Sequence, residues 1–500
     1  MTYAIILIYF VVILAIGLSA SRKSKTSEGY LIGGKGFGPW LTAFKFAATL
    51  ESGTKLVGTP GMAFGIGYPA FLQGMWTPVA YFLSFRVFGE RMKIACDYFN
   101  VITVPQLLER RYGGKHLRVL AAIAILVGLG GSLIAQFKAL GEIFSSLFGT
   151  TYFTGLLIGV GLVAFYSIIG GYTATVWTDL VQGIVMMIGV VALLIATVGA
   201  AYGSFSLGFL GQLNADLAAK APHMLELTGG GRMPIVMIIT MSVIGCIVGI
   251  AQPQQAVALF SMKDTRVAKT AMVIATIFST VLIWCLLPSA MVGRLILNPA
   301  DIPNPDAVIP LLTKTVLPPS LAGLMTAAIL SAIMSTVSGL IIVSAAAVSH
   351  DIMDIVAPAI YRKNSVFWDR MAAALIALAC FLLAIDPPQI IFWIVLFAFG
   401  FTVFTFIMPM IGVVLWKRAN LTSVTIQMIT TMLLIPIWQI LSTAKLVRLS
   451  GLTVGMVVTP ILFIVITLLT KNKNQKDVDA LWEAYHAGGI VRGNMKATRE

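Results

Sequence analysis

Charged residues are scarce in this 500-residue sequence. They make up 11% of the chain, whereas hydrophobic residues make up 58%. A water-soluble domain carries about 25% charged residues, so a soluble protein of this length would have too little polar surface. This scarcity excludes a soluble enzyme and a soluble binding protein.

Cysteines and catalytic motifs are also few. Only four cysteines occur, and their spacing fits neither a zinc site nor a disulfide framework. The sequence contains no HExxH motif and no GxSxG motif, and its four histidines lie outside the apolar blocks or near their ends. We therefore expect no enzyme activity.

Long apolar blocks are what the sequence does contain. Blocks of about 18 or more apolar residues are typical of membrane-spanning helices, and the first, which begins at residue 3, lacks the basic flank and cleavage site of a removable signal peptide. The sequence predicts an all-α membrane protein with thirteen spans, at 3–20, 40–66, 68–89, 119–147, 153–170, 176–202, 233–259, 269–292, 320–348, 371–386, 388–414, 424–443 and 452–470.

The basic residues are distributed unevenly between the two sides of such a bundle. With thirteen spans and the N-terminus outside, 24 lysines and arginines fall on the cytoplasmic side and six on the opposite side. Cytoplasmic loops of membrane proteins carry this excess. The net charge of +14 therefore indicates topology rather than a nucleic-acid partner. We expect a protein of the cell (inner) membrane, surrounded by lipid, with its C-terminus in the cytoplasm.

Two of the predicted spans contain residues that interrupt a helix. The second holds ATLESGTKLVGTPGMAFGIG (48–67), and the seventh holds GIAQPQQ (249–255). In secondary transporters, interrupted helices at corresponding positions of two inverted repeats mark the substrate and ion site near the middle of the membrane. A simple kink is the alternative at each position, but the offset of five spans favours a transport site.

The ninth predicted span offers oxygen atoms on one face. Ala332, Ser335 and Thr336 are spaced i, i+3 and i+4, so they share one side of a helix. Hard cations prefer oxygen ligands, and one carbonyl with two hydroxyls could replace part of the hydration shell of a sodium ion. Alternatively, the hydroxyls bond to carbonyls of their own helix.

Four motifs resemble those of the sodium:solute symporter family, which includes proline, pantothenate, sugar and sialic acid transporters. They are IGGKGFGPW (32–40), GGYTATVWTDLVQGIVM (170–186), GIAQPQQAVALFSMKD (249–264) and AAILSAIMSTVSG (327–339). The resemblance covers roughly residues 1–470. It implies a transmembrane symporter domain of the leucine-transporter-like fold, with five-plus-five inverted repeats at about 40–202 and 233–414, followed by a cytoplasmic tail at 471–500.

The resemblance also implies a sodium site. The sodium ion, Na+, would be bound by the carbonyls of Ala48 and Glu51 in the second span and by Ala332, Ser335 and Thr336 in the ninth. Apolar residues are usual in the family at the position of Glu51, but a carbonyl ligand does not depend on the side chain.

A second sodium site occurs in some members of the family. It would use Asp179 with Ser335 and Ser338, but Gly339 stands where a further hydroxyl residue is usual. The alternative for Asp179 is a helix cap at the start of the sixth span.

Ionisable residues inside spans are costly and point to function. Glu51 and Lys55 are spaced i, i+4 across the interruption in the second span. Three interpretations of Lys55 stay open: it neutralises Glu51, it binds a substrate carboxylate, or it replaces the coupling ion, which would give proton-coupled or uncoupled transport. Lys45 and Arg86 lie nearer span ends, from which long side chains reach the interface.

The substrate prediction depends on finer resemblances. Three stretches resemble pantothenate symporters, at 136–137, 304–323 and 386–400, and Leu50 stands where proline transporters have an aspartate. We expect sodium-coupled import of a small carboxylate such as pantothenate, without an obligatory protein partner. The alternatives are a proline, amino-acid or other monocarboxylate symporter. The residues expected to contact the solute are Ser52, Lys55, Gln73, Gln136, Lys138, Gln252, Gln254 and Phe399.

Overall fold

The structure is a computed structural model that describes residues 1–302, 304–386, 391–472 and 474–488. Within these residues the regular structure is helical throughout, apart from one isolated bridge between Phe37 and Met262. Nine of the described helices are long and apolar enough to cross a membrane. The C-terminal end of the predicted tail, 489–500, lies outside the described residues.

Most described helices begin and end near the predicted spans, although the helix expected at 371–386 begins at Ser365, and the number of thirteen spans stays a prediction. The long helices are α1 (Thr2–Ala20), α9 (Lys115–Phe148), α10 (Tyr152–Tyr202), α12 (Ile235–Ala251), α14 (Arg266–Ile296), α16 (Pro319–Ala346), α19 (Ser365–Ile385), α20 (Ile391–Val414), α21 (Leu421–Thr443) and α22 (Gly451–Leu469). The shorter helices are α2 (Ser27–Ile32), α3 (Pro39–Leu50), α4 (Thr59–Ile66), α5 (Tyr68–Gly74), α6 (Trp76–Leu83), α7 (Glu90–Phe99), α8 (Val104–Tyr112), α11 (Phe209–Lys220), α13 (Pro253–Phe260), α15 (Val308–Val316), α17 (Asp354–Val356), α18 (Pro358–Lys363) and α23 (Gln475–His486).

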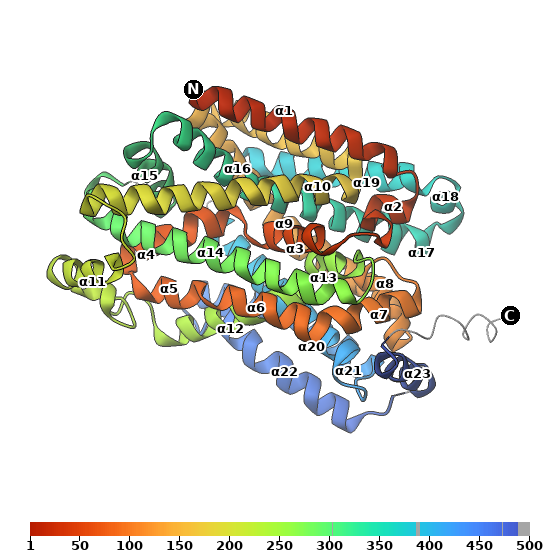
Figure 1. Ribbon diagram of the computed structural model, residues 1–500. Helices are drawn as coiled ribbons and strands as arrows, with labels where there is room; N and C mark the ends of the chain where they lie inside the picture. The colour runs from red at the N-terminus through yellow and green to blue at the C-terminus, as the bar shows by residue number, and fades with distance from the viewer. Residues whose placement is uncertain (303, 387–390, 473, 489–500) are drawn as a thin grey trace.

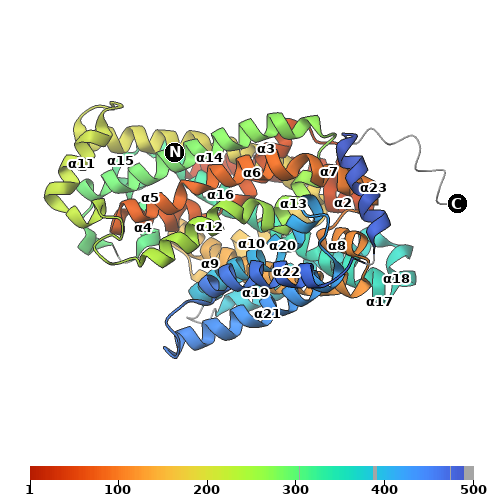
Figure 2. The same cartoon turned by 90° about the horizontal axis from the view of Figure 1, so that it is seen from below.

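The long helices run side by side along one direction (Figure 1). One end of the bundle carries α4, α11 and α15, and the opposite end carries α2, α8, α18 and α23. We call these the α15 end and the α8 end. Seen from below, α21 and α22 lie next to each other along one side of the bundle (Figure 2), and they are packed together.

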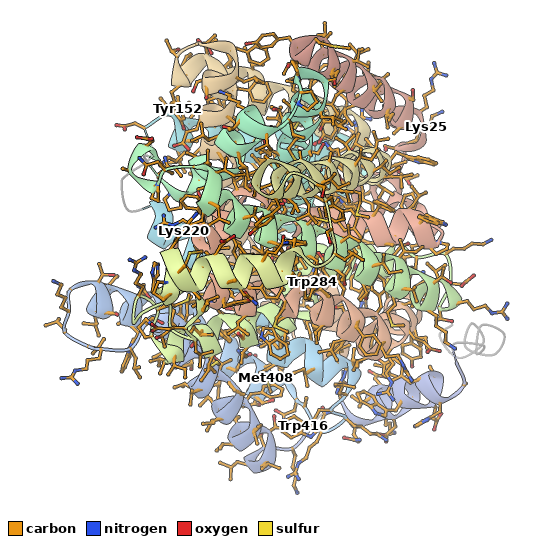
Figure 3. The ribbon with its side chains drawn as sticks, turned by 60° about the vertical axis from the view of Figure 1, so that its left-hand side comes forward. Lys25, Tyr152, Lys220, Trp284, Met408 and Trp416 are labelled. Atoms are coloured by element: carbon orange, nitrogen blue, oxygen red, sulfur yellow. The ribbon has the colours of Figure 1, made fainter. Side chains whose placement is uncertain are left out.

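Helix α16 lies at the centre of the bundle. In the span that contains it, 94% of the most apolar window is buried, against 28% for α19 and for α21. The outer helices expose large apolar side chains instead, among them Leu375, Leu378 and Leu433. Trp284 is likewise half-exposed on α14 (Figure 3). A surface of this kind suits contact with lipid, and the chain is an integral membrane protein.

Helix α10 contains two antiparallel arms. Tyr152 donates a hydrogen bond to the carbonyl of Ala384 at one end of α19, whereas the carbonyl of Ile169 accepts from Arg370 near the other end. Beyond Gly171, whose φ of 61° and ψ of −158° are not helical, the chain returns. A helix of 51 residues would be about 76 Å long and could not fit one membrane crossing. The reversal separates two of the predicted spans without a loop.

The interruption in the seventh predicted span follows from Pro253. Proline has no N–H group and clashes with the carbonyl four residues earlier, and it restricts the residue before it to extended backbone. Helix α12 accordingly ends at Ala251, Gln252 is extended (φ −89°, ψ 123°), and Pro253 begins α13. This break lies beside α3, because Gly249 packs against Phe46.

Candidate functional site

The second predicted span breaks at Glu51. Helix α3 ends at Leu50, Glu51 has a non-helical ψ of 74°, and a short π-helix (Thr54–Gly58) precedes α4. In an unbroken helix the N–H of Ser52 would donate to the carbonyl of Ala48. Here it donates to the carbonyl of Leu50 instead. The last turn of α3 therefore has carbonyl oxygens without their usual helical donors.

Hydroxyl groups of α16 meet these carbonyls. Ser335 Oγ donates to the carbonyl of Ala48 at 2.8 Å, and Thr336 Oγ1 donates to that of Thr49 at 3.1 Å. Both hydroxyls also lie near the carbonyl of Ala332, at 3.1 and 2.9 Å. The structure thus gathers neutral oxygens from α3 and α16 in one buried place. That they bind sodium stays a prediction.

The Glu51 carboxylate lies on the other side of the break. Its Oε1 accepts hydrogen bonds from Tyr81 (2.8 Å) and Ser279 (2.9 Å), and its Oε2 lies 3.7 Å from the ammonium of Lys55. The Glu51 side chain is only 2% exposed. Two hydroxyl donors and a nearby cation stabilise this buried charge.

Lys55 is the accessible member of this group. Its side chain is 24% exposed, and besides Glu51 its ammonium contacts only Thr77, at 3.4 Å, among the described residues. Gln136 is buried beside Gly53, and no hydrogen-bond partner of its Oε1 is found in the described part of the chain. The predicted solute residue Ser52 lies at the start of this segment, where its carbonyl accepts from the N–H groups of Lys55 and Leu56.

The remaining predicted solute residues lie around this group or farther out. Gln252 and Gln254 are buried and hydrogen-bonded to each other at the α12–α13 break, and Phe399 is half-buried against the core. The Oε1 of Gln73 has no partner in the ranges described. Lys138 is 40% exposed and pairs with Glu142 at 3.7 Å, so it is not part of the Glu51–Lys55 pair.

Asp179 is neither a helix cap nor near a helix end. It lies within the second arm of α10, where its Oδ2 is 2.8 Å from the ammonium of Lys45 and 3.2 Å from the hydroxyl of Thr49. The expectation that Lys45 reaches the membrane interface was wrong, because this side chain is 2% exposed. The carboxylate retains Lys45 in the interior.

Comparison with known proteins decides the family. The model of the sodium:solute symporter family matches residues 30–431, most of the chain. The chain belongs to the sodium:solute symporter family. The family prediction is thereby confirmed, and with it sodium as the coupling ion of a solute symporter.

Individual relatives of this symporter span nearly its whole length. The sodium/pantothenate symporter of Escherichia coli (strain K12) is 30% identical over 419 residues, which cover 82% of this chain and 85% of that protein. The osmoregulated proline transporter OpuE of Bacillus subtilis (strain 168) is 25% identical and covers 93% of this chain and 94% of its own. A solved substrate-bound, outward-open sodium-coupled sialic acid symporter has a similar fold, with a TM-score of 0.79, 18% identity, and coverage of 94% and 97%.

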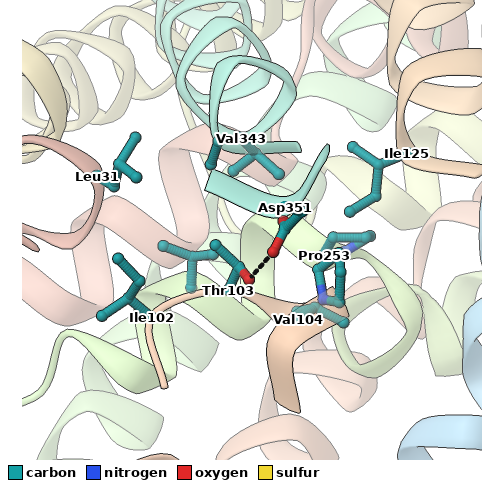
Figure 4. A pocket seen from close by; sticks show the side chains of 11 residues that line it. Leu31, Ile102, Thr103, Val104, Ile125, Pro253, Val343 and Asp351 are labelled. Atoms are coloured by element: carbon teal, nitrogen blue, oxygen red, sulfur yellow. Dashed lines mark hydrogen bonds between the residues drawn. The ribbon is translucent and has the colours of Figure 1, made fainter. Parts of the chain in front are cut away.

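A network of ion pairs lies at the α8 end of the symporter. Arg118 bridges Asp351 (3.0 Å), Glu109 (3.4 Å) and Asp354 (3.7 Å), and it donates to the carbonyl of His350 at 2.7 Å. Beside this cluster is a cavity of about 10 Å³, roughly the space of one water molecule. Figure 4 shows the hydrogen bond from Thr103 to Asp351 at its wall. This network joins α8 and α9 to the segment that follows α16.

Sequence reasoning missed four contributors to this site. Tyr81 and Ser279 bind Glu51, Thr49 joins the Asp179 pair to the α16 hydroxyls, and Lys45 neutralises Asp179. Three of the four are ordinary polar residues within apolar spans, so only the packing of distant helices distinguishes them. The burial of Lys45 had one signal, since a lysine in one apolar span can pair with an aspartate in another.

Proposed function

We propose that this symporter binds sodium between the break in α3 and the centre of α16, and that sodium drives import of a small carboxylate such as pantothenate. The observation that carries the proposal is the pair of hydrogen bonds from Ser335 and Thr336 to the carbonyls of Ala48 and Thr49. The carbonyl and hydroxyl oxygens of these bonds are neutral, buried and close together. A hard cation could therefore bind them in place of the hydrogen bonds, once the hydroxyl protons turn away.

The ligands are those of the resembling family, namely the carbonyls of Ala48, Glu51 and Ala332 with the hydroxyls of Ser335 and Thr336. The Glu51 side chain does not compete with this role, because its carboxylate is already bound by Tyr81 and Ser279. The backbone carbonyl of Glu51 then acts separately from its side chain.

Lys55 is the residue that we assign to the solute carboxylate. It lies beside the break, is partly exposed and keeps a distance of 3.7 Å from Glu51. An ammonium with free donors can bind a carboxylate. A zwitterionic amino acid would also need an acceptor for its own ammonium, and the Glu51 side chain, only 2% exposed, offers little of its carboxylate to a solute. This favours an anion over proline.

The proposed transport cycle is alternating access across an inner cell membrane. The thirteen spans, the five-plus-five inverted repeats at about 40–202 and 233–414, and an outside N-terminus are supported by the paired breaks and by the charge distribution. The α8 end is then cytoplasmic, and the Arg118 cluster is its closed gate. Because coupling is reciprocal, solute must raise sodium affinity by the factor by which sodium raises solute affinity.

The experiment is an uptake measurement in proteoliposomes that contain the purified symporter. An inward sodium gradient should drive accumulation of labelled pantothenate, whereas an equal potassium gradient should not. A panel of monocarboxylates and amino acids, proline included, identifies the solute. Uptake that proceeds equally in potassium would refute the sodium site.

A further inference from the structure

A second charged pair is buried one residue away from the proposed sodium site. Lys45 and Asp179 are 2% and 0% exposed, and their ammonium and carboxylate groups are 2.8 Å apart. Thr49 connects the pair to the site: its hydroxyl donates to Asp179, and its carbonyl accepts from Thr336. A carboxylate so close to a cation site would itself attract a cation.

The Lys45 ammonium lies where a second cation would be expected, and this position is the basis of the inference. In some members of the resembling family a second sodium ion would use the positions of Asp179, Ser335 and Ser338, and we call these three residues together the second-cation position. The Lys45 ammonium is directly bound to the carboxylate of that set. The hydroxyl of Ser338 meanwhile donates to the carbonyl of Ser335.

Gly339 leaves space for the Lys45 side chain because it has no side chain of its own. A Cβ atom placed on Gly339 would lie 3.5 Å from the Lys45 ammonium and only 2.9 Å from Cγ2 of Thr49. A serine hydroxyl at this position would therefore extend into the region that the ammonium fills. Without a side chain on Gly339, this region is left to the Lys45 ammonium.

We propose that Lys45 is a tethered cation that permanently fills the second-cation position, so that this symporter carries a single sodium ion in each cycle. The inference rests on the proposed sodium site. The ammonium supplies the positive charge that Asp179 requires, since an unpaired carboxylate in this interior would be costly. Because Lys45 belongs to the chain, its charge is not transported.

The test counts sodium ions bound to the purified symporter in detergent by equilibrium binding of radioactive sodium-22, which needs no solute. The unaltered chain should bind one sodium per molecule with a Hill coefficient of about one. The double variant Lys45→Ala/Gly339→Ser, which empties the place of the ammonium and adds a hydroxyl, should bind two with a Hill coefficient above one. Lys45→Arg, which keeps a cation at this position, should still bind one.

The outcomes separate this inference from the proposed function. No sodium bound to the unaltered chain would refute the site between α3 and α16. Two sodium ions bound to it would refute only the tethered cation. A folded double variant, shown by a single symmetric gel-filtration peak, that still binds one sodium would also refute the tethered cation. If the double variant does not fold, the number of sodium ions bound to the unaltered chain decides alone, and two would refute the tethered cation.

Discussion

The hydroxyl of Ser335 donates a 2.8 Å hydrogen bond to the carbonyl of Ala48, which lies 287 residues earlier in the chain. The bond joins the most buried helix of the bundle to the point where another helix stops. Backbone groups freed inside a membrane must find partners within the protein or around a polar cavity. The central hydroxyls of α16 provide those partners.

Removing these hydroxyls should remove sodium coupling. We expect Ser335→Ala/Thr336→Ala to show no sodium-stimulated uptake in proteoliposomes, because two of the proposed ligands are lost. Ser331→Ala is the matched control: the same residue type on the same helix, fully buried, but bound to Tyr9 instead. It should keep its sodium dependence. Normal sodium stimulation in the double variant would contradict the proposed site.

Lys55→Met should weaken an anionic solute selectively. A hydrogen bond to a charged group contributes about 1.5–3 kcal/mol, so we expect KM for the carboxylate to rise about 10- to 100-fold. The sodium dependence should persist. Lys220→Met, a change on the surface helix α11, serves as the control and should leave uptake unchanged. An unaltered KM in Lys55→Met would rule out the carboxylate contact.

Arg118→Ala should loosen the α8 end. The variant leaves buried Asp351 without its cation, which is strongly destabilising for that closure. The measurement is labelling of a cysteine at Val343, on the wall of the small cavity, by an impermeant maleimide applied to the cytoplasmic side, in a background whose four native cysteines are replaced. We expect labelling at least about tenfold faster, equivalent to about 1.4 kcal/mol.

A nearby arginine provides the comparison for this gate. Arg362 also pairs with Asp354, at 2.8 Å, but its side chain is 71% exposed. Exposed ion pairs contribute about 0–1 kcal/mol, so Arg362→Ala should label at nearly the original rate. Equal rates in the two variants would show that the Arg118 cluster does not hold the α8 end closed.

Tyr81→Phe and Ser279→Ala should each destabilise the folded symporter through Glu51. Each change removes a hydroxyl donor from a buried carboxylate, at a cost of about 1.5–3 kcal/mol. Thermal unfolding in detergent measures the effect. Tyr112→Phe loses a bond to a neutral carbonyl and should cost less. Adding Glu51→Gln to either variant should restore part of the lost thermal stability, since a neutral amide needs fewer donors than a carboxylate. If Glu51→Gln restores none of it, this account is contradicted.

The sequence predicted the helices well because apolar length and proline chemistry are local properties. The break at Gln252 follows from Pro253 alone, and the bounds of α16 follow from its apolar residues. The reversal at Gly171 was expected only as a short loop, because nothing local shows that a glycine pair can turn two helices back on each other without one.

The part of the site that depends on local spacing was predicted, and the part that depends on packing between distant helices was not. The spacing of Ala332, Ser335 and Thr336 places them on one helix face, which is a local fact that the structure retains. The Lys45–Asp179 pair depends on which arm of α10 packs against α3, a long-range relationship that no spacing encodes. A lysine six residues from a helix start was therefore interpreted as interfacial rather than buried.

A cycle in which Lys45 is the tethered cation would have an electrical consequence. One sodium ion moving with one monocarboxylate carries no net charge across the membrane. The membrane potential, which is equivalent to about 2.3 kcal/mol per elementary charge per 100 mV, then does no work on the cycle. Accumulation would be limited by the sodium concentration ratio alone, about 1.4 kcal/mol for each tenfold difference, and the symporter would work equally well in a depolarised cell.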